Sequence, residues 1–275
     1  MITVDALSLR LGQTRVLEQV SARFERGRVT AILGPNGAGK TSLLRAVAGL
    51  VAVEEGTVHI HRRPRAGGGR FPDEVPMLLN GPRLRGGDVI ENLTRARTIG
   101  YLPQNGQPAW AITVRELVEL GRLPHRSRFA ALSPADEAAI AAALDATDMA
   151  ALADRPVDAL SGGEKARAKF ARVLAGDPDW ILADEPLANL DPPHARDVER
   201  LLRGAADDGK GVIVVLHQLN AALRLADDVV LIKSGRVLAA GPVGDVLVPE
   251  TLETLFGMRF ELVEDERGRA LVPLG

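Results

Sequence analysis

Short apolar runs, bounded by glycine, proline and polar residues, recur along most of the chain and predict β-strands. Residues 2–9 and 16–24 alternate loosely between apolar and polar side chains, and Gly12, Gln13 and Thr14 predict a turn between them. Strands that are apolar throughout are typical of parallel sheets covered on both faces. Runs of this kind occur at residues 29–33, 180–183, 212–216 and 229–232.

Apolar residues at a helical period lie between the predicted strands. Leu43, Leu44, Val47 and Leu50 follow the run 29–33 and a glycine-rich stretch, so the order there is strand, loop, helix. Alternation of strands with helices predicts an α/β fold with a mostly parallel sheet.

The second half of the chain contains the longest helical pattern, over residues 114–174. Within it, Ser133 followed by Pro134 predicts a helix N-terminus, with serine as the cap and proline in the first turn. Residues 247–275 predict a short helix followed by two weak strands, around 260–263 and 270–272.

Residues 62–98 differ from the rest of the chain in composition. They include 8 Arg, 4 acidic residues, 6 Gly and 4 Pro, and their one apolar cluster is Met77, Leu78 and Leu79. This composition predicts a segment that is mostly irregular and exposed.

Charge and composition exclude several classes of protein. The formal net charge is -2, which argues against a general nucleic-acid binder or a polybasic membrane anchor. The absence of cysteine excludes a disulfide framework, a thiolate metal site and a cysteine nucleophile. No run approaches 18 apolar residues, and residues 1–5 lack the start of a secretory signal. We therefore expect a cytosolic-type chain that does not span a membrane by itself.

The glycine-rich stretch after residues 29–33 matches the phosphate-loop pattern G-x-x-x-x-G-K-[ST]. In such a loop, backbone N–H groups curl around a β-phosphate, and the following helix adds its positive N-terminal end. Lys40 is expected to reach the β- and γ-phosphates, and the Thr41 hydroxyl to ligate Mg²⁺. The spacing, with a strand before and a helix after, argues against an ordinary turn. The predicted nucleotide-binding residues are Gly34, Pro35, Asn36, Gly37, Ala38, Gly39, Lys40, Thr41 and Ser42.

Two carboxylates end the apolar run 180–183. Asp184 is the candidate for holding a metal ion, and Glu185 is the candidate for orienting and deprotonating water. A solvated strand end is the simpler interpretation of this pair by itself. The phosphate loop in the same chain favours the catalytic interpretation.

Leu160-Ser161-Gly162-Gly163-Glu164 opens a predicted helix that runs to about Leu174. Ser161 and Glu164 fit a capping box, which is a sufficient structural reason for both residues. The two glycines also leave N–H groups at the helix start open to an anion. This segment alone does not decide between the two interpretations.

These motifs, in this order, resemble the ATP-binding subunits of ABC transporters, over the chain from about residue 4 to the C-terminus. The resemblance implies that Ser161, Gly162 and Gly163 bind the γ-phosphate of an ATP held by the phosphate loop of a second copy. It further implies that Gln104 contacts Mg²⁺ and the attacking water. Asp191 would then belong to the D-loop of the family. His217, which as a lone residue would more often be structural, then contacts the γ-phosphate.

The resemblance also implies an architecture: a P-loop NTPase (RecA-like) core with an antiparallel β subdomain and an inserted α-helical subdomain. In this interpretation the chain is one ATP-binding domain. Its core would comprise residues 1–104 and 176–246, its helical subdomain 105–175, and its tail 247–275. The helical subdomain would dock on transmembrane permease subunits at the cytoplasmic face of a bacterial inner membrane. Two copies would form a head-to-tail dimer around two ATP molecules.

Three features depart from the usual family pattern. Leu11 stands where an aromatic residue normally stacks on adenine, which predicts weaker nucleotide affinity and base selectivity. Gln218 stands where an aspartate usually follows the histidine, and Thr41-Ser42 inverts the common order of hydroxyl residues. None of these removes a phosphate, metal or base group, so we expect an active ATPase.

Residues 241–258 resemble those of bacterial importers of iron complexes, haem and vitamin B12. The predicted function is therefore to energise uptake of an iron chelate, a siderophore or haem, delivered by a periplasmic or lipoprotein binding protein; a cobalamin importer is the alternative. Two rivals are a soluble ABC ATPase acting on DNA or ribosomes and a non-hydrolysing regulatory partner. Near-zero net charge and a single set of motifs argue against nucleic acid as a partner. Residues 62–98 are either a solvated loop or a contact to permease or anionic headgroups.

Overall fold

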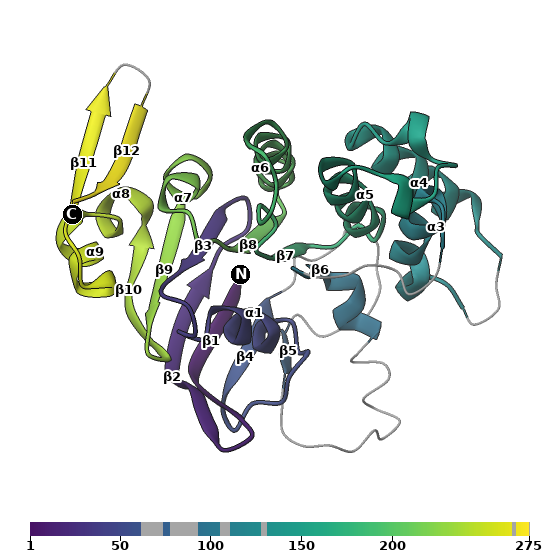
Figure 1. The fold of residues 1–275 in the computed structure, drawn as a ribbon. Coiled ribbons are helices and arrows are strands. Elements are labelled where there is room, and N and C mark those ends of the chain that lie inside the picture. Colours follow the sequence, from purple (N-terminus) through teal and green to yellow (C-terminus); the bar gives the residue numbers. More distant parts are fainter. Residues whose placement is uncertain (62–73, 78–92, 105–110, 128–130, 266–267, 275) are drawn as a thin grey trace. The chain divides into compact units, whose positions relative to one another are not determined.

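The computed structural model describes residues 1–61, 74–77, 93–104, 111–127, 131–265 and 268–274. The chain divides into two compact units, of which the first comprises Met1–Pro82 with Ile213–Gly275 and the second comprises Arg83–Val212. Figure 1 shows their strands and helices. Each unit has its own set of buried apolar side chains.

One sheet of the first unit is antiparallel, with the strand order β2-β1-β4-β5. Strands β1 and β2 join through the turn at Gly12 and Gln13, which pairs Leu11 with Thr14. The sheet confirms the antiparallel β subdomain that the resemblance implied. Its strands are β1 (Ile2–Leu11), β2 (Thr14–Phe24), β4 (Glu55–His61) and β5 (Glu74–Met77).

The other strands of the first unit run in the order β10-β9-β3-β8, and β3 pairs with β9 in parallel. Every residue of β3 is buried, as its apolar sequence predicts. These strands are β3 (Val29–Leu33), β8 (Gly211–Val215, which enters this unit at Ile213), β9 (Asp228–Lys233) and β10 (Arg236–Pro242).

The helices of the first unit are α1 (Lys40–Val47), α7 (Leu219–Leu225), α8 (Val243–Val246) and α9 (Pro249–Phe256). The tail ends in a hairpin of β11 (Phe260–Asp265) and β12 (Gly268–Pro273), as predicted. Asn220 of α7 holds this hairpin, because its side chain accepts from the Leu271 N–H at 2.8 Å and donates to the Leu271 carbonyl at 3.3 Å.

The part of the second unit that the structure describes is mainly helical and contains one parallel strand pair, β6 with β7. Capping boxes open three of its helices, at Thr113, Ser133 and Ser161, so the predicted N-terminus at Ser133 is confirmed. Its elements are β6 (Ile99–Leu102), α3 (Val114–Glu119), η1 (Leu120–His125), α4 (Pro134–Ala146), η2 (Ala150–Leu152), η3 (Val157–Ala159), α5 (Gly162–Ala175), β7 (Trp180–Asp184) and α6 (Pro192–Asp207).

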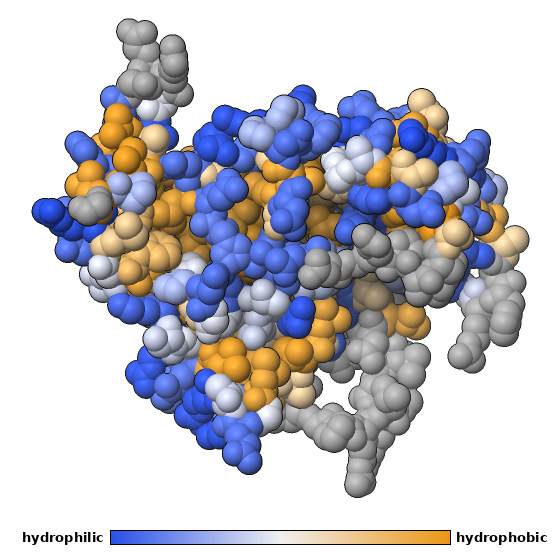
Figure 2. Space-filling view, in the orientation of Figure 1, coloured by the Kyte–Doolittle hydropathy of each residue, from blue (hydrophilic) through white to orange (hydrophobic). Residues whose placement is uncertain are grey.

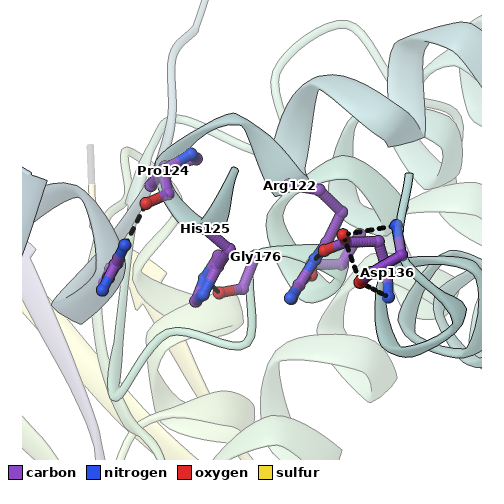
Figure 3. Close-up of polar contacts among 8 residues, drawn as sticks. Arg122, Pro124, His125, Asp136 and Gly176 are labelled. Atoms are coloured by element: carbon purple, nitrogen blue, oxygen red, sulfur yellow. Dashed lines mark hydrogen bonds and ion pairs between the residues drawn. The ribbon is translucent and has the colours of Figure 1, made fainter. Parts of the chain in front are cut away.

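A buried polar network ties η1 to the start of α4 and the end of α5 (Figure 3). The Arg122 guanidinium donates from Nε to Asp136 at 2.8 Å and from Nη1 to the Ala175 carbonyl at 2.8 Å. His125 Nε2 lies 2.8 Å from the Gly176 carbonyl, so Nε2 carries the hydrogen. Burial lowers the pKa of His125. A cation and an N–H donor thus satisfy carbonyls at the C-terminus of α5, where the helix dipole favours positive charge.

The Asp136 carboxylate accepts hydrogen bonds from the Ser133 hydroxyl and N–H and from Arg122, and these hold its pKa well below the ordinary 3.8. A carboxyl whose pKa is lower in the folded state stabilises the fold above its ordinary pKa, and loses that contribution as pH falls through the folded value. We predict that Asp136→Asn lowers the urea midpoint at pH 7 and that the gap to wild type narrows below about pH 4. The exposed Asp145→Asn is the matched control; a gap independent of pH would contradict the prediction.

The sequence predicts that residues 62–98 are mostly irregular and exposed, and it indicates no regular element among them. Residues 74–77 nevertheless form β5, paired with β4, and residues 93–98 are helical. Thr98 at the end of that helix is buried. Neither element has an apolar pattern strong enough to be recognised from the sequence, because β5 contains a proline and the helix contains two arginines. The remainder of 62–98 lies outside the described residues.

Candidate nucleotide-binding and catalytic site

The phosphate loop of the first unit requires glycine at two close approaches. A side chain at Gly34, with φ of 152°, would place its Cβ 2.1 Å from the Ile232 carbonyl oxygen. At Gly39, with φ of 102°, the Cβ would lie 2.7 Å from Leu17 Cδ2. Gly37 has φ of 77° in open space, so it is required for conformation alone. The loop between β3 and α1 therefore has a backbone path that other residues would not adopt.

Lys40 opens α1 and is only 5% exposed. Its Nζ donates to the carbonyls of Gly34 and Pro35, both at 2.9 Å, so the ammonium lies inside the curve of the loop. Thr41 and Ser42 follow on the first turn of α1, both half-buried. A helix N-terminus, backbone N–H groups and one lysine ammonium together form a site that favours a polyphosphate.

Two other candidates lie in the first unit at the ends of strands. His217 is exposed and follows β8, and Gln218 is the residue directly before α7. Leu11 ends β1 with its side chain 52% exposed. An exposed leucine offers a surface that could cover a base but provides no ring for stacking.

The second unit brings three candidates together where β6 and β7 end. Asp184, the last residue of β7, is 1% exposed, and Tyr101 donates its hydroxyl to Asp184 Oδ2 at 3.3 Å. Glu185 follows with φ of 51°, a left-handed conformation that turns the chain sharply after the strand. Gln104, just past β6, donates its amide to Glu185 Oε2 at 2.5 Å. The carboxyl ends of two parallel neighbours thus place an amide and two carboxylates side by side.

Sequence analysis missed two residues that support this group. Tyr101 is the only tyrosine of the chain, and its carbonyl accepts from Arg172 Nη2 of α5 at 2.9 Å. Burial lowers the pKa of Arg172. The signal available in the sequence was the single tyrosine, three residues before the candidate Gln104. Its link to Asp184 spans 83 positions and depends on strand pairing.

The segment 161–163 also lies in the second unit. Ser161 caps α5: its Oγ accepts from the Glu164 N–H at 3.3 Å, and Glu164 accepts from the Ser161 N–H at 2.7 Å. Those hydrogen bonds, from the Ser161 N–H first, lower the pKa of Glu164. Gly162 and Gly163 follow as the first two helical residues, whose N–H groups have no acceptor within the helix. The capping box and an anion site are therefore compatible, because they use different N–H groups.

The donors proposed for a metal ion are of a type that suits Mg²⁺. A hydroxyl at Thr41, an amide oxygen at Gln104 and a buried carboxylate at Asp184 are all hard oxygen ligands. Within the described residues, no three His, Cys, Asp or Glu side chains gather into a metal site of their own. Mg²⁺ bound with a nucleotide usually completes its shell with phosphate oxygens and water.

Comparison with known proteins decides the family. The model of the ABC transporter family matches residues 17–188, from β2 through the phosphate loop and the segment 161–163 to just beyond Glu185. The chain belongs to the ABC transporter family. It is an ATP-binding cassette with ATPase activity.

Relatives of this cassette match almost its whole length. The hemin import ATP-binding protein HmuV of Rhodococcus jostii (strain RHA1) is 38% identical over 265 residues, covering 96% of this chain and 82% of that protein. The iron(3+)-hydroxamate import ATP-binding protein FhuC of Bacillus subtilis (strain 168) is 30% identical over 267 residues, covering 97% and 91%. The cobalamin import ATP-binding protein BtuD of Halobacterium salinarum (strain ATCC 29341 / DSM 671 / R1) is 35% identical over 265 residues, covering 96% and 61%.

Solved structures agree on the cassette fold. A dimeric bacterial ABC transporter cassette is 27% identical, with a TM-score of 0.70, and the match covers 88% of this chain and 99% of that one. The same cassette is known in a post-hydrolysis state with ADP and Pi. An inward-facing ABC transporter of the metal-chelate type, 24% identical, matches with a TM-score of 0.80 over 100% of this chain and 97% of that one. The predicted P-loop NTPase fold is thus confirmed.

Among the residues that the structure describes, no helix combines the length and the apolar character needed to cross a membrane.

Proposed function

We propose that this cassette hydrolyses ATP to energise uptake of an iron chelate, haem or a ferric siderophore, through a separate permease. The observation that carries the proposal is similarity at 30–38% identity, over 96–97% of the chain, to cassettes named for hemin and iron(3+)-hydroxamate import. A cobalamin importer is the second candidate, because the relative named for cobalamin import is 35% identical.

In the proposed mechanism the loop of Gly34 to Ser42 holds the ATP phosphates, with Lys40 on the β- and γ-phosphates. Thr41, Gln104 and Asp184 would hold Mg²⁺, which when bound neutralises charge on the phosphate oxygens. Glu185 orients the attacking water and accepts its proton, and the amide of Gln104 fixes the direction of that carboxylate through their hydrogen bond.

A second copy would complete the site in a head-to-tail dimer. Ser161, Gly162 and Gly163 of one copy would then meet the γ-phosphate on the loop of the other, supported by the uncapped first-turn N–H groups of α5. His217 would contact the γ-phosphate. Asp191 would contact the phosphate loop of the opposite copy. ATP binding would close this dimer, and hydrolysis would open it.

The remaining assignments follow the same architecture. We infer a nucleotide-binding core at 1–104 and 176–246, a helical subdomain at 105–175 and a tail at 247–275. The helical subdomain would dock on the permease, at the cytoplasmic face of a bacterial inner membrane. A periplasmic or lipoprotein binding protein would supply the chelate on the opposite face.

The experiment that tests the function is purification of tagged Glu185→Gln protein from its native membranes with ATP and Mg²⁺, followed by mass spectrometry of bound partners. Recovery of a multi-span permease is expected, and its binding protein can be titrated with haem, ferric siderophores and cobalamin. Binding of cobalamin alone would replace the iron-chelate assignment. Recovery of ribosomal or DNA-repair proteins with no membrane protein would contradict import.

We further predict that Leu11→Tyr tightens ATP binding by about two- to tenfold, because an aromatic contact adds roughly 0.5–1.5 kcal/mol beyond burial. The side chain at this position is exposed, so a larger residue meets no core constraint. Titration with fluorescent ATP and GTP analogues measures the affinity and the base selectivity. Leu50→Tyr, at another exposed leucine, is the control. Equal affinities for the two variants would show that Leu11 does not face the base.

A further inference from the structure

The first turn of α5 lies in direct contact with an imidazole ring from α6. A Cβ added at Gly163 would lie 2.3 Å from His194 Cγ, 2.5 Å from its Cδ2 and 2.6 Å from its Nδ1. Real Cβ atoms do not approach other atoms so closely. The ring of His194 therefore occupies the space that a side chain at position 163 would need. His194 lies three residues after Asp191, the N-cap residue of α6.

The two ring nitrogens of His194 face two carboxylates of its own helix. Nε2 lies 3.8 Å from Asp191 Oδ1, and Nδ1 lies 3.6 Å from Asp197 Oδ2. Nδ1 is buried and makes no hydrogen bond within the described part of the chain. The ring thus lies between Gly163, on which it packs, and the two carboxylates near its nitrogens.

The contact belongs to a larger junction between α5 and α6. Arg167 of α5 places Nη1 3.5 Å from Asp197 Oδ2 of α6, and Arg200 of α6 pairs with the other oxygen of the same carboxylate. Asp197 therefore pairs with one arginine from each helix. His194 contacts both this carboxylate and Gly163 in the first turn of α5. Removal of the ring would change the packing at Gly163 and the contact with Asp191.

We propose that His194 is a positioning residue of the ATP sandwich: its ring fixes the N–H groups of the α5 first turn relative to Asp191. This inference rests on the proposed dimer, in which those N–H groups meet the γ-phosphate held by the second copy. His194 itself contacts no nucleotide in this arrangement. The ring sets the spacing between the α5 first turn and Asp191, and both must contact the opposite copy. Loss of the ring should therefore impair dimer closure and turnover.

This role separates nucleotide binding from closure. The phosphate loop that binds ATP in a single copy lies in the first unit, whereas His194, Gly163 and Asp191 all lie in the second. His194→Ala should therefore leave ATP affinity of the monomer within about twofold of wild type. Turnover should fall about tenfold, because a displacement of roughly 1 Å in a site-forming group can cost up to about a hundredfold and the loss of this ring displaces the α5 first turn by less.

The experiment uses the full chain in three steps. First, fluorescent ATP titration gives monomer affinity for wild type and His194→Ala. Second, steady-state kinetics separates kcat from KM. Third, analytical ultracentrifugation with ATP compares dimerisation of Glu185→Gln alone with that of the Glu185→Gln, His194→Ala double variant, in which we expect a dimer dissociation constant about tenfold higher. Arg203→Ala, which removes an exposed pair with Asp207 on the same helix, is the matched control.

A second variant tests the packing directly. Gly163→Ala is expected to abolish turnover, because its Cβ would collide with the ring. If that collision is the cause, Gly163→Ala combined with His194→Ala should recover part of the lost activity relative to Gly163→Ala alone. No recovery in a double variant that folds, as judged by its urea midpoint, would overturn the packing assignment.

The outcomes distinguish this inference from the proposed function. If Glu185→Gln alone stays monomeric with saturating ATP, the dimer proposal fails and the effect of His194 on closure fails with it. Suppose that Glu185→Gln dimerises, that adding His194→Ala does not change this dimerisation, and that His194→Ala alone has the kcat of wild type. The positioning role is then wrong while the dimer stands. A fall in monomer ATP affinity matching the fall in kcat would assign His194 a general structural role and overturn the proposal.

Discussion

Replacing Lys40 with alanine should abolish ATP binding at millimolar nucleotide. The ammonium is buried inside the loop, bonded to the carbonyls of Gly34 and Pro35, so it is held where phosphate oxygens would collect. Removing one partner of a buried charged contact costs about 2–5 kcal/mol, which corresponds to roughly 30- to 4000-fold in affinity. Equilibrium titration with a fluorescent ATP analogue measures the loss, and turnover should fall with it.

Loss of binding must be separated from collapse of the loop, because Lys40 also links two loop carbonyls. Lys40→Met retains the length of the side chain without its charge and should lose binding as Lys40→Ala does, with a urea midpoint close to wild type. Lys210→Ala, which removes a lysine that contacts Asp177 and the Pro178 carbonyl, should bind ATP normally. ATP affinity within twofold of wild type in Lys40→Met would contradict the assignment of this loop.

The phosphate loop is the part of the site that sequence predicts best, because its function resides in the backbone of consecutive residues. The spacing of Gly34, Gly39 and Lys40 fixes which N–H groups can face a phosphate, and the structure places Lys40 at the first position of α1. The neighbours that make those glycines necessary are less predictable. Ile232 and Leu17 come from strands distant in sequence, and only the fold brings them to the loop.

Contacts across sequence-distant elements account for what sequence analysis missed. Tyr101 bonds to Asp184 because β6 and β7 pair in parallel, and Gly163 meets His194 because α5 and α6 pack together. Neither contact follows from the local pattern, which indicates only that Gly163 lies at a helix start. Strand β5 was missed for the same reason. Its pairing with β4, with Val58 opposite Met77, defines it as a strand, whereas its own sequence has no strand pattern.

Glu185→Gln is the substitution that best separates ATP binding from its hydrolysis. The variant retains the size of the side chain and the contact with Gln104, while its neutral amide no longer accepts a proton from water. General-base catalysis contributes about 10²–10⁴-fold, so kcat should fall by that factor while ATP affinity stays near wild type. Because closure depends on bound ATP and opening on its hydrolysis, the variant should accumulate as a dimer with ATP. Analytical ultracentrifugation and phosphate release measure the two effects on the same sample.

The position of Glu185 explains why this one carboxylate should have so large an effect. Its left-handed backbone, with φ of 51°, directs the side chain away from the course of β7 and toward Gln104, whereas the neighbouring Asp184 continues the strand and is buried. The two adjacent acids thus have different environments, so Asp184→Asn should weaken ATP binding that depends on Mg²⁺ while Glu185→Gln leaves it intact. Asp207→Asn, at an exposed carboxylate paired with Arg203, controls for the loss of one charge and should retain full turnover. Wild-type turnover in the Glu185→Gln protein would remove Glu185 from the catalytic role. A Glu185→Gln protein that stays monomeric at saturating ATP would instead contradict the proposed dimer.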